Sequence, residues 1–443
     1  MKIDKNKLER QLIGRDRWFA NNCRGTFEWV TGVGKTYGAI LCMKKVLEIK
    51  PDASFIIVVP RDPLRDMWRE EIKNHNIPNA KVDTIHMLAK SNNECDMLVL
   101  DELHMYVGKD ASVFPKIFEN TECNRILGLT ATITGSSVMR DVVNANCPVI
   151  DSIPVDVALE EGFVSEYIQY NLGIPLSQED TIKYARLNGK FYKHFGLFNN
   201  NFDLVKACLS QSGAERFASS INWDTGAIIG MARKTMTAIR ERKQFLYGAP
   251  SKLDVAEQII NKFSDHKIIT FSQTTEPADK LASRIDRADS YHSNINTRLF
   301  VDENQIGEKC GKGKYKLYED GGVYSWDQIK EKHDDVKRYG TKRLRERILT
   351  AFKNGDITVL CSAQALDVGF DDDSINMGIV LSATSQQRQN IQRTGRVIRA
   401  KEGKRAIIIQ LYILDTQDEK WLNDRQTNSE NIKNIFSVEQ IQI

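Results

Sequence analysis

Residues suited to holding the phosphates of a nucleotide lie near the start of this 443-residue sequence, in Thr31-Gly32-Val33-Gly34-Lys35-Thr36. An apolar, β-rich run precedes the loop and a helical pattern follows it. Glycines let backbone N–H groups wrap phosphates, while Lys35 reaches the β- and γ-oxygens and the Thr36 hydroxyl binds Mg²⁺. The usual pattern has a glycine five residues before Gly34, where this sequence has Trp29. The order of strand, loop and helix still favours a phosphate loop over a chance helix-capping turn.

An acidic pair follows the apolar run at 97–100, in Asp101-Glu102-Leu103-His104. An acid at the carboxyl end of a buried parallel strand lies at the sheet edge where open α/β folds bind ligands. We expect Asp101 to hold Mg²⁺ directly or through water, and Glu102 to polarise an attacking water. In isolation the pair would suit a helix N-cap, but the Lys35 loop favours the catalytic interpretation.

Paired arginines form the third group, in Gln392-Arg393-Thr394-Gly395-Arg396-Val397-Ile398-Arg399. A spacing of three places Arg396 and Arg399 on one face of a helix. This half of the chain has no phosphate loop of its own, so we interpret the pair as arginine fingers that neutralise charge on a transferring phosphoryl group. A solvated basic helix is the alternative and the commoner use of such runs.

Short apolar runs alternate with helical patterns in two regions, which predicts βαβ units and parallel sheets covered on both faces. Strands are expected at 26–30, 54–59, 97–100, 126–129, 267–271, 357–361, 377–381 and 405–412, with helices at 35–50 and 63–74. We therefore expect an α/β fold with two lobes, 1–152 and 250–443. The stretch 153–249 lacks a buried-strand pattern and predicts a helical connector or subdomain. An irregular insertion is expected at 297–341, and the polar tail after Gln426 is expected to be peripheral.

Composition narrows the class of protein. Sixty-two basic and 59 acidic residues leave a net charge of +3, which excludes a polybasic protein, so any nucleic-acid contact must come from a local groove. No apolar run approaches the ~20 residues of a membrane span, and the charged start predicts no secretory leader. Eight scattered cysteines form no Cys-x-x-Cys pair, which argues against zinc ribbons and for a reducing, cytoplasmic compartment.

Together with Thr130-Ala131-Thr132, these three groups occur in the order and spacing of motifs I, II, III and VI of superfamily 2 helicases. The chain therefore resembles a DExH-type helicase with two RecA-like lobes, an ATPase that uses ATP and Mg²⁺. The resemblance covers both lobes but neither 153–249 nor 297–341. It implies further ATP-binding positions at Gln11, Gly369, Asp371 and Gln392. It also implies that His104, Thr130 and Thr132 couple the ATP site to a nucleic-acid groove.

The resemblance also implies contacts to a nucleic-acid backbone, which would be sequence-independent. The segments that carry it look like motifs Ia, Ib, IV and V, and the implied contacts are Arg61, Thr84, His86, Ser272 and Ser362. Motif V commonly begins with a threonine, which is replaced around Ser362. For Trp68, beside motif Ia, the pattern favours core packing over base stacking, and His292 receives no catalytic role.

The segments at 162–167 and 384–386 resemble the helicases grouped with type I and III restriction motors, XPB-like proteins and phage recombination helicases. This group is mostly DNA-directed, which implies a monomeric DNA helicase or translocase in recombination, repair or replication, in a bacterial or phage-infected cytoplasm. An RNA helicase stays open, because a phosphate contact does not reveal the 2′-OH.

Two alternatives come from other classes of protein. An ATP-dependent clamp without unwinding is motivated by Trp29, and a small-molecule kinase would leave the second lobe unexplained. Within the insertion, 309–318 contains four lysines and two tyrosines, a mixture that suits a wedge or single-strand contact. A solvated loop is the alternative for that segment.

Overall fold

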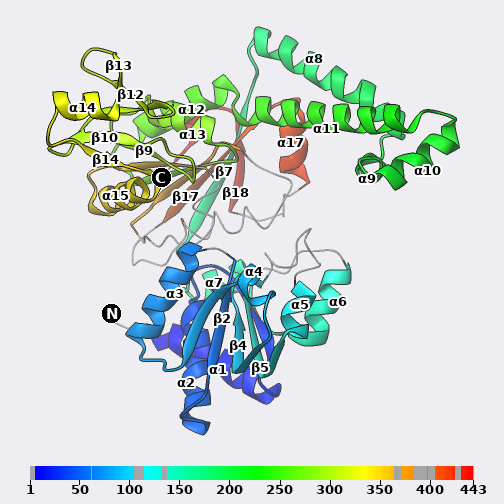
Figure 1. Ribbon diagram of the computed structural model, residues 1–443, viewed down its shortest axis with the longest axis vertical. Helices are drawn as coiled ribbons and strands as arrows, with labels where there is room; N and C mark the ends of the chain where they lie inside the picture. Colours follow the sequence, from blue (N-terminus) through cyan, green and yellow to red (C-terminus); the bar gives the residue numbers. More distant parts are fainter. Residues whose placement is uncertain are drawn as a thin grey trace. The chain divides into compact units, whose positions relative to one another are not determined.

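The computed structural model describes residues 5–60, 62–103, 114–131, 137–363, 372, 374–382, 397, 405–424 and 431–442 (Figure 1). They form two compact units, the first built mainly from Met1–Ile168 and the second mainly from Gln169–Ala365 and Ile409–Ile443. Each unit combines a sheet with helices, so the expected α/β class is confirmed. None of the described helices is both long enough and apolar enough to cross a lipid bilayer.

The first unit contains a six-stranded sheet in the order β3-β2-β4-β5-β1-β6. Its strands are β1 (Arg24–Trp29), β2 (Phe55–Val59), β3 (Ala80–Thr84), β4 (Asn93–Leu100), β5 (Thr121–Thr130) and β6 (Val149–Ile153). All neighbouring strands run parallel, so their carboxyl ends meet at one edge of the sheet. The four strands predicted here are confirmed. The strands β3 and β6 were not predicted, because each of these edge strands includes exposed residues and neither forms a continuous apolar run.

Seven helices accompany this sheet in the part of the unit that the structure describes. They are α1 (Lys5–Ala20), α2 (Lys35–Ile49), α3 (Asp62–Asn74), α4 (Ile85–Leu88), α5 (Phe114–Glu119), α6 (Ser137–Asn146) and α7 (Val155–Glu160). The helices predicted at 35–50 and 63–74 are therefore confirmed. A core of apolar side chains from β2, β4 and β5 packs with residues of α4, α5 and α6 on one side of the sheet.

The second unit contains a seven-stranded sheet in the order β18-β7-β17-β16-β8-β15-β9. Its strands are β7 (Tyr167–Ile174), β8 (Ile268–Ser272), β9 (Ala288–Tyr291), β15 (Val359–Ala363), β16 (Met377–Val380), β17 (Ala406–Ile413) and β18 (Ile432–Ile435). The helices α12 (Pro250–Lys262), α13 (Thr275–Ala282), α15 (Thr341–Asn354) and α17 (Gln417–Asn423) accompany it. Every residue of β8, β15, β16 and β17 is buried, which is why their apolar runs predicted these strands correctly.

The expectation that 153–249 has no buried strand is wrong, because β7 lies inside the second sheet. Two polar residues hide this strand in the sequence. Gln169 donates to Asn171 over 2.9 Å, and Asn171 donates to Asn434 of β18 over 2.9 Å, so the buried amides satisfy one another. The expectation that the tail after Gln426 is peripheral is also wrong at β18, since this strand pairs with β7 and adds an edge strand to the sheet.

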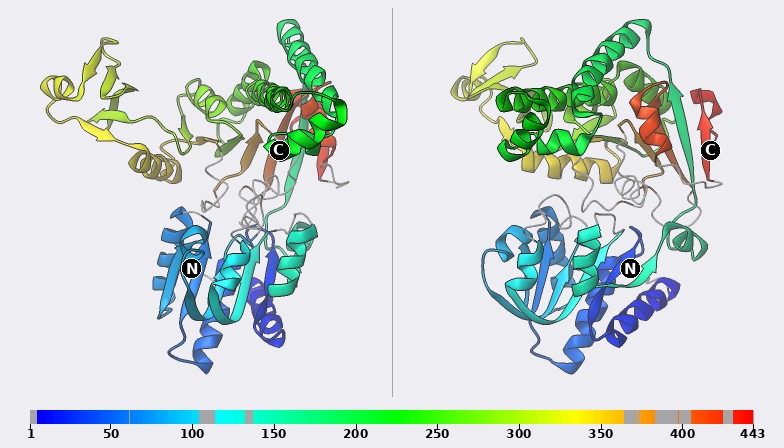
Figure 2. Two further views of the ribbon diagram at one scale, coloured as in Figure 1. Left: turned by 45° about the vertical axis from the view of Figure 1, so that its right-hand side comes forward. Right: turned by 90° about the vertical axis from the view of Figure 1, so that its right-hand side faces the viewer.

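The remainder of that stretch is helical, as predicted. It consists of α8 (Gln178–Phe195), α9 (Phe202–Ala207), α10 (Gln211–Ile221) and α11 (Thr225–Tyr247), with a short 3₁₀ turn at Gly196–Phe198. Two of these helices, α8 and α11, run side by side (Figures 1 and 2). Side chains such as Phe198, Val205 and Ile228 form a separate small core for this helical subdomain.

The insertion at 297–341 is ordered, so the expectation of an irregular stretch is wrong. It forms an antiparallel sheet of β10 (Arg298–Val301), β11 (Asn304–Gly311), β12 (Lys314–Leu317), β13 (Val323–Ser325) and β14 (Lys337–Tyr339), with α14 (Trp326–Lys332). Figure 2 shows it standing off from the seven-stranded sheet of the same unit. Leu299, Tyr315, Leu317 and Ile329 give it a core of its own. Because Tyr315 is buried there, only Tyr318 of the two tyrosines in 309–318 is exposed.

Candidate active site

The predicted phosphate loop connects the end of β1 to the start of α2. Gly32 and Gly34 have φ values of 106° and 92°, a left-handed conformation that favours glycine. Gly34 is the N-cap of α2, so the helix begins at Lys35 with its free N–H groups at the loop. The Lys35 Nζ donates to the backbone oxygen of Trp29 over 3.0 Å. These features suit an anion-binding loop at a helix N-terminus.

Helix α1 lies against this loop and brings Gln11 to it. The Gln11 Nε2 donates to the backbone oxygen of Val33 over 2.7 Å, and the side chain is buried. Lys7, one helical turn earlier, donates to the backbone oxygen of Gly32. The structure thus joins Gln11 to the phosphate loop, as its predicted place in the ATP site requires. Sequence reasoning missed Lys7, although its i, i+4 spacing from Gln11 was a usable signal.

A buried carboxylate holds α1 in this position. Asp151 on β6 is fully buried and accepts hydrogen bonds from Arg10 over 2.7 and 2.9 Å, and also from Arg17. The indole N–H of Trp29 donates to the same carboxylate over 2.7 Å. Four donors from α1 and β1 therefore compensate the burial of one charge. This cluster links α1 to the strands next to the phosphate loop, and no local pattern of residues predicts it.

The same cluster explains the departure from the usual loop pattern at Trp29. Its ring is fully buried and stacks on Phe27, with ring centroids 4.4 Å apart. A Cβ atom would lie 2.4 Å from this ring at Gly14 and 2.7 Å from it at Gly38. Two glycines of the flanking helices thus make room for the indole, so the loop conformation survives without a glycine at position 29.

The acidic pair follows β4 directly. Asp101 is buried, and its Oδ2 accepts the indole N–H of Trp68 over 2.7 Å while its Oδ1 accepts the Glu102 backbone N–H over 3.0 Å. Burial and then the nearby charge of Glu102 raise the pKa of Asp101 to about 7, against the lowering effects of Trp68 and Lys35. Lys35 and Asp101 are thus close enough to interact electrostatically. Trp68 packs in the core, as predicted. Its hydrogen bond to Asp101 was not predicted from the sequence.

The residues at this edge of the first sheet fit Mg²⁺. A buried carboxylate with a raised pKa lacks a sufficient counter-charge, and Mg²⁺ prefers one or two carboxylates with phosphate oxygens and water. Asp101 and the half-buried Thr36 are the oxygen donors that would hold it. In the described part of the chain, no three His, Cys, Asp or Glu side chains cluster as a metal site that would compete with this assignment.

The other predicted residues differ in where the structure places them. Thr130, expected to couple the two sites, is buried at the end of β5 beside β1. Thr84 directly precedes α4. His86 lies on α4 with an exposed side chain, so it is accessible to a nucleic-acid strand. Several predicted residues lie outside the described residues, namely Arg61, His104, Thr132, Gly369, Asp371, Gln392, Arg396 and Arg399.

Two residues of the second unit that were predicted to contact a nucleic-acid backbone are buried. The Ser272 hydroxyl donates to the backbone oxygens of Thr274 over 2.8 Å and Ser362 over 3.0 Å. Ser362 is itself 2% exposed. Neither hydroxyl faces solvent, so in this structure both side chains shape the ends of β8 and β15 instead of presenting a contact surface.

Two segments of the chain match known protein families. Residues 4–89 match the family described as type III restriction enzyme, res subunit, and residues 328–401 match the helicase conserved C-terminal domain. The DNA 3'-5' translocase XPB2 of Sulfurisphaera tokodaii is 22% identical over 419 residues, spanning 89% of this chain and 79% of that protein. The ATP-dependent DNA helicase MPH1 of Scheffersomyces stipitis is 24% identical over 225 residues, 47% of this chain and 20% of that protein.

Two solved structures share the fold. The Pyrococcus furiosus Hef helicase domain aligns over 96% of this chain and 100% of its own, with a TM-score of 0.51 and 15% identity. The type ISP restriction-modification enzyme LlaBIII bound to DNA aligns over 97% of this chain and 31% of its own, with a TM-score of 0.52 and 14% identity. The expected architecture of two RecA-like lobes is confirmed by these alignments and by the two sheets.

Proposed function

We propose that this chain, a superfamily 2 helicase related to the restriction-motor and XPB-like group, hydrolyses ATP in order to translocate along or unwind DNA. The observation that carries the proposal is the meeting of Lys35, at the start of α2, with the buried Asp101 after β4. Relatives named as DNA translocases and helicases support DNA over RNA as the track.

The roles proposed for the chain's residues follow from their geometry. Backbone N–H groups of the phosphate loop and of the first turn of α2 would bind the phosphates, while Lys35 exchanges the Trp29 carbonyl for a phosphate oxygen. Mg²⁺ held by Thr36 and Asp101 would neutralise charge on the phosphates. Glu102, at the turn after β4, would orient the attacking water.

Three further parts of the proposal rest on the sequence. Arg396 and Arg399 would neutralise charge on the transferring phosphoryl group, and Gln392, Gly369 and Asp371 would contact the nucleotide. Arg61 would join His86 in holding a strand. We also propose that the chain acts as a monomer in a reducing cytoplasm, which its eight free cysteines support.

The clamp alternative loses its motivation. It rested on Trp29 in place of a glycine, and the packing of that ring between Gly14 and Gly38 accounts for the substitution without any loss of the loop. The acid that would orient water, Glu102, is retained. Hydrolysis therefore remains the function that this site supports best.

Steady-state ATP hydrolysis tests the proposal, measured without polynucleotide and with single-stranded DNA, duplex DNA, forked DNA and RNA. We expect strong stimulation by DNA that weakens as salt rises. Glu102→Gln should lower kcat by about 10²-fold or more, as loss of a water-orienting base does. Glu94→Gln is the matched control, because this exposed acid lies near the other end of β4. Full turnover in Glu102→Gln would refute the role proposed for Glu102. Stimulation of ATP hydrolysis by RNA alone would refute DNA as the track.

A further inference from the structure

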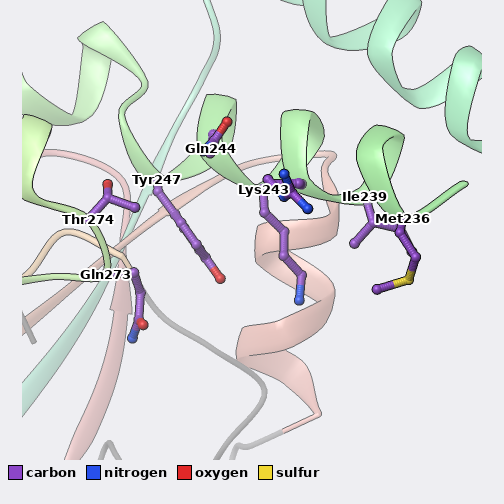
Figure 3. A pocket seen from close by; sticks show the side chains of 8 residues that line it. Met236, Ile239, Lys243, Gln244, Tyr247, Gln273 and Thr274 are labelled. Atoms are coloured by element: carbon purple, nitrogen blue, oxygen red, sulfur yellow. The ribbon is translucent and has the colours of Figure 1, made fainter. Parts of the chain in front are cut away.

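The inserted sheet of the second unit, β10 to β14 with α14, contributes no residue to the proposed ATP site. Figure 2 shows it standing off from the seven-stranded sheet, and its core of Leu299, Tyr315, Leu317 and Ile329 is its own. The hollow of the second unit between α11 and the loop after β8 (Figure 3) is lined by none of its residues. The insertion is thus a separately packed element, and we looked for its function on its own surface.

Positive charge is concentrated in one hairpin of the insertion, formed by β11, a turn at 312–313 and β12. From 309 to 318 the chain has four lysines and no acid, whereas 319–336 has six acids and two lysines. The insertion as a whole is balanced, with nine basic and nine acidic residues. Charges of opposite sign are therefore separated along it, and the hairpin is a local positive patch on a nearly neutral protein.

The hairpin lysines are not neutralised by the acids that follow them. Lys312, Lys314 and Lys316 are exposed, and among the residues that the structure describes none of the three forms an ion pair. Asp320, just beyond β12, accepts a hydrogen bond from Lys332 of α14 over 2.9 Å. The nearest acid after the hairpin is therefore engaged with a cation from another element, and the hairpin keeps its charge.

The hairpin backbone is held by its packing against the rest of the insertion. Tyr315 is buried, its hydroxyl accepts a hydrogen bond from Arg338 of β14 over 3.1 Å, and its ring centroid lies 5.8 Å from that of Trp326. Because successive side chains of a strand point to opposite faces, Lys314 and Lys316 lie on the face opposite this core, about 6.6 Å apart along β12. A fixed backbone that presents these lysines lowers the entropy lost on binding.

The turn end of the hairpin is its most positive part. Glu308 of β11 lies opposite Lys316 in the register of the sheet, and it also lies opposite Arg298 of β10. This acid therefore reduces the positive potential around Lys316. Lys312, in the turn, and Lys314, at the start of β12, have no acid opposite them, since Lys314 is opposite Gly311 on β11 and Ser325 on β13.

We propose that the turn end of this hairpin binds the phosphate backbone of duplex DNA, with Lys312 and Lys314 each contacting a phosphate. The proposal rests on the proposed function and adds to it a duplex contact outside the two RecA-like sheets. Lysine suits this role because its ammonium group is a compact point charge on a flexible stem, which contacts phosphates without reading bases.

The structure favours a duplex over the single strand that the sequence suggested for this segment. Single strands are bound through aromatic rings on which the bases stack. Tyr315 is buried in the core of the insertion, and the exposed Tyr318 follows the end of β12 that is remote from the turn. The turn end therefore offers cations but no exposed ring.

The same surface is unsuited to a protein partner. Stable protein interfaces are centred on buried apolar or aromatic side chains, with charges mainly at the rim. From 310 to 314 the exposed residues are lysine, glycine and one cysteine. A surface of this composition has charge for a polyanion but no apolar centre.

Fluorescence anisotropy of a labelled blunt duplex and of a labelled oligothymidylate, each titrated with the full chain over a range of salt, tests this site. We expect Lys312→Gln with Lys314→Gln to weaken duplex binding about tenfold. The slope of log K against log salt should fall by about 1.8, because each phosphate contact on duplex DNA contributes about 0.9. The affinity for oligothymidylate should not change.

Two further chains complete this experiment. The conservative pair, Lys312→Arg with Lys314→Arg, should retain most of the duplex affinity because it keeps both charges. Lys330→Gln with Lys337→Gln is the matched control, since it removes two exposed cations from α14 and β14 of the same insertion. The control chain should bind the duplex with nearly wild-type affinity.

The outcomes separate this site from the proposed function. Wild-type duplex affinity and salt slope in the Lys312→Gln, Lys314→Gln chain would overturn the DNA site and leave an acidic protein segment as the ligand of the hairpin. An equal loss in the control chain would also overturn it, because the loss would reflect total charge alone. An equal loss on oligothymidylate would overturn the assignment to a duplex. A wild-type chain that neither binds DNA nor is stimulated by it would overturn the proposed function itself.

Discussion

The buried carboxyl group at the end of β4 predicts an unusual dependence of stability on pH. Burial and then Glu102 raise the pKa of Asp101 from 3.8 to about 7. For an acid whose pKa is raised by folding, stability is highest below the unfolded pKa, falls as pH rises between the two values, and is constant above the folded one. Replacing Asp101 by Asn removes this titration. We therefore expect the Asp101→Asn chain to gain stability relative to the wild type as pH rises, although it should lose ATPase activity.

The difference between the folded and unfolded pKa of Asp101 sets how much the free energy of unfolding changes with pH. About three pH units at about 1.36 kcal/mol each correspond to roughly 4 kcal/mol when Asp101 is fully ionised. About 1.5 kcal/mol of this cost is already present at pH 5, so the change between pH 5 and pH 8 is about 2.5 kcal/mol. The Asn amide must also face either Trp68 or the Glu102 N–H as a second donor, which costs about 1–3 kcal/mol. That second cost is independent of pH, so the trend with pH isolates the carboxyl group.

Scanning calorimetry in EDTA at pH 5, 6, 7 and 8 measures this trend as the difference in Tm between Asp101→Asn and wild type. Asp96→Asn, toward the other end of β4, is the matched control. Hydrogen bonds from Lys50 and Ser54 hold the pKa of Asp96 below its ordinary value, so its charge adds stability above pH 4. The control should therefore have a lower Tm than wild type at all four pH values. A difference for Asp101→Asn that is flat or falls with pH would refute the reasoning.

Three other substitutions test the contacts around the site. Trp68→Phe keeps an aromatic ring in the core but removes the donor to the acid after β4, so kcat for ATP hydrolysis should fall on the order of tenfold; an unchanged kcat would show that the bond is dispensable. Lys252→Met leaves the fully buried Asp418 without its cation, which should cost about 3–5 kcal/mol in urea unfolding, and equal stability would contradict the ion pair. Asp151→Ala should raise KM for ATP about fivefold through displacement of Gln11, a loss of about 1 kcal/mol in binding, and an unchanged KM would remove that positioning role.

Much of the fold could be predicted because buried parallel strands appear in the sequence as continuous apolar runs. This holds for β2, β8 and β17, each buried along its whole length. It fails for β7, whose amides are compensated by β18 from the far end of the chain. The inserted sheet escaped prediction for a related reason, since its short strands bury few residues each and share one small core.

The candidate site divides in the same way. The phosphate loop and the acidic pair were found because each places several functional groups within a few residues of one another. The contact from Trp68 to Asp101 spans 33 residues, and those of Arg10 and Trp29 with Asp151 span more than a hundred. Such pairs follow from the order of strands in the sheet, which one sequence does not reveal.

By itself the sequence determined the chemistry of the first unit: a glycine-rich turn at a helix start, a lysine for phosphate and acids at a strand end are local arrangements set by neighbouring residues. Tertiary structure decided how these groups are held and charged. Burial raises the pKa of Asp101, and Asp151 ties α1 to the strands below the loop. Burial and long-range pairing depend on which distant segments meet, and only the folded chain brings those segments together.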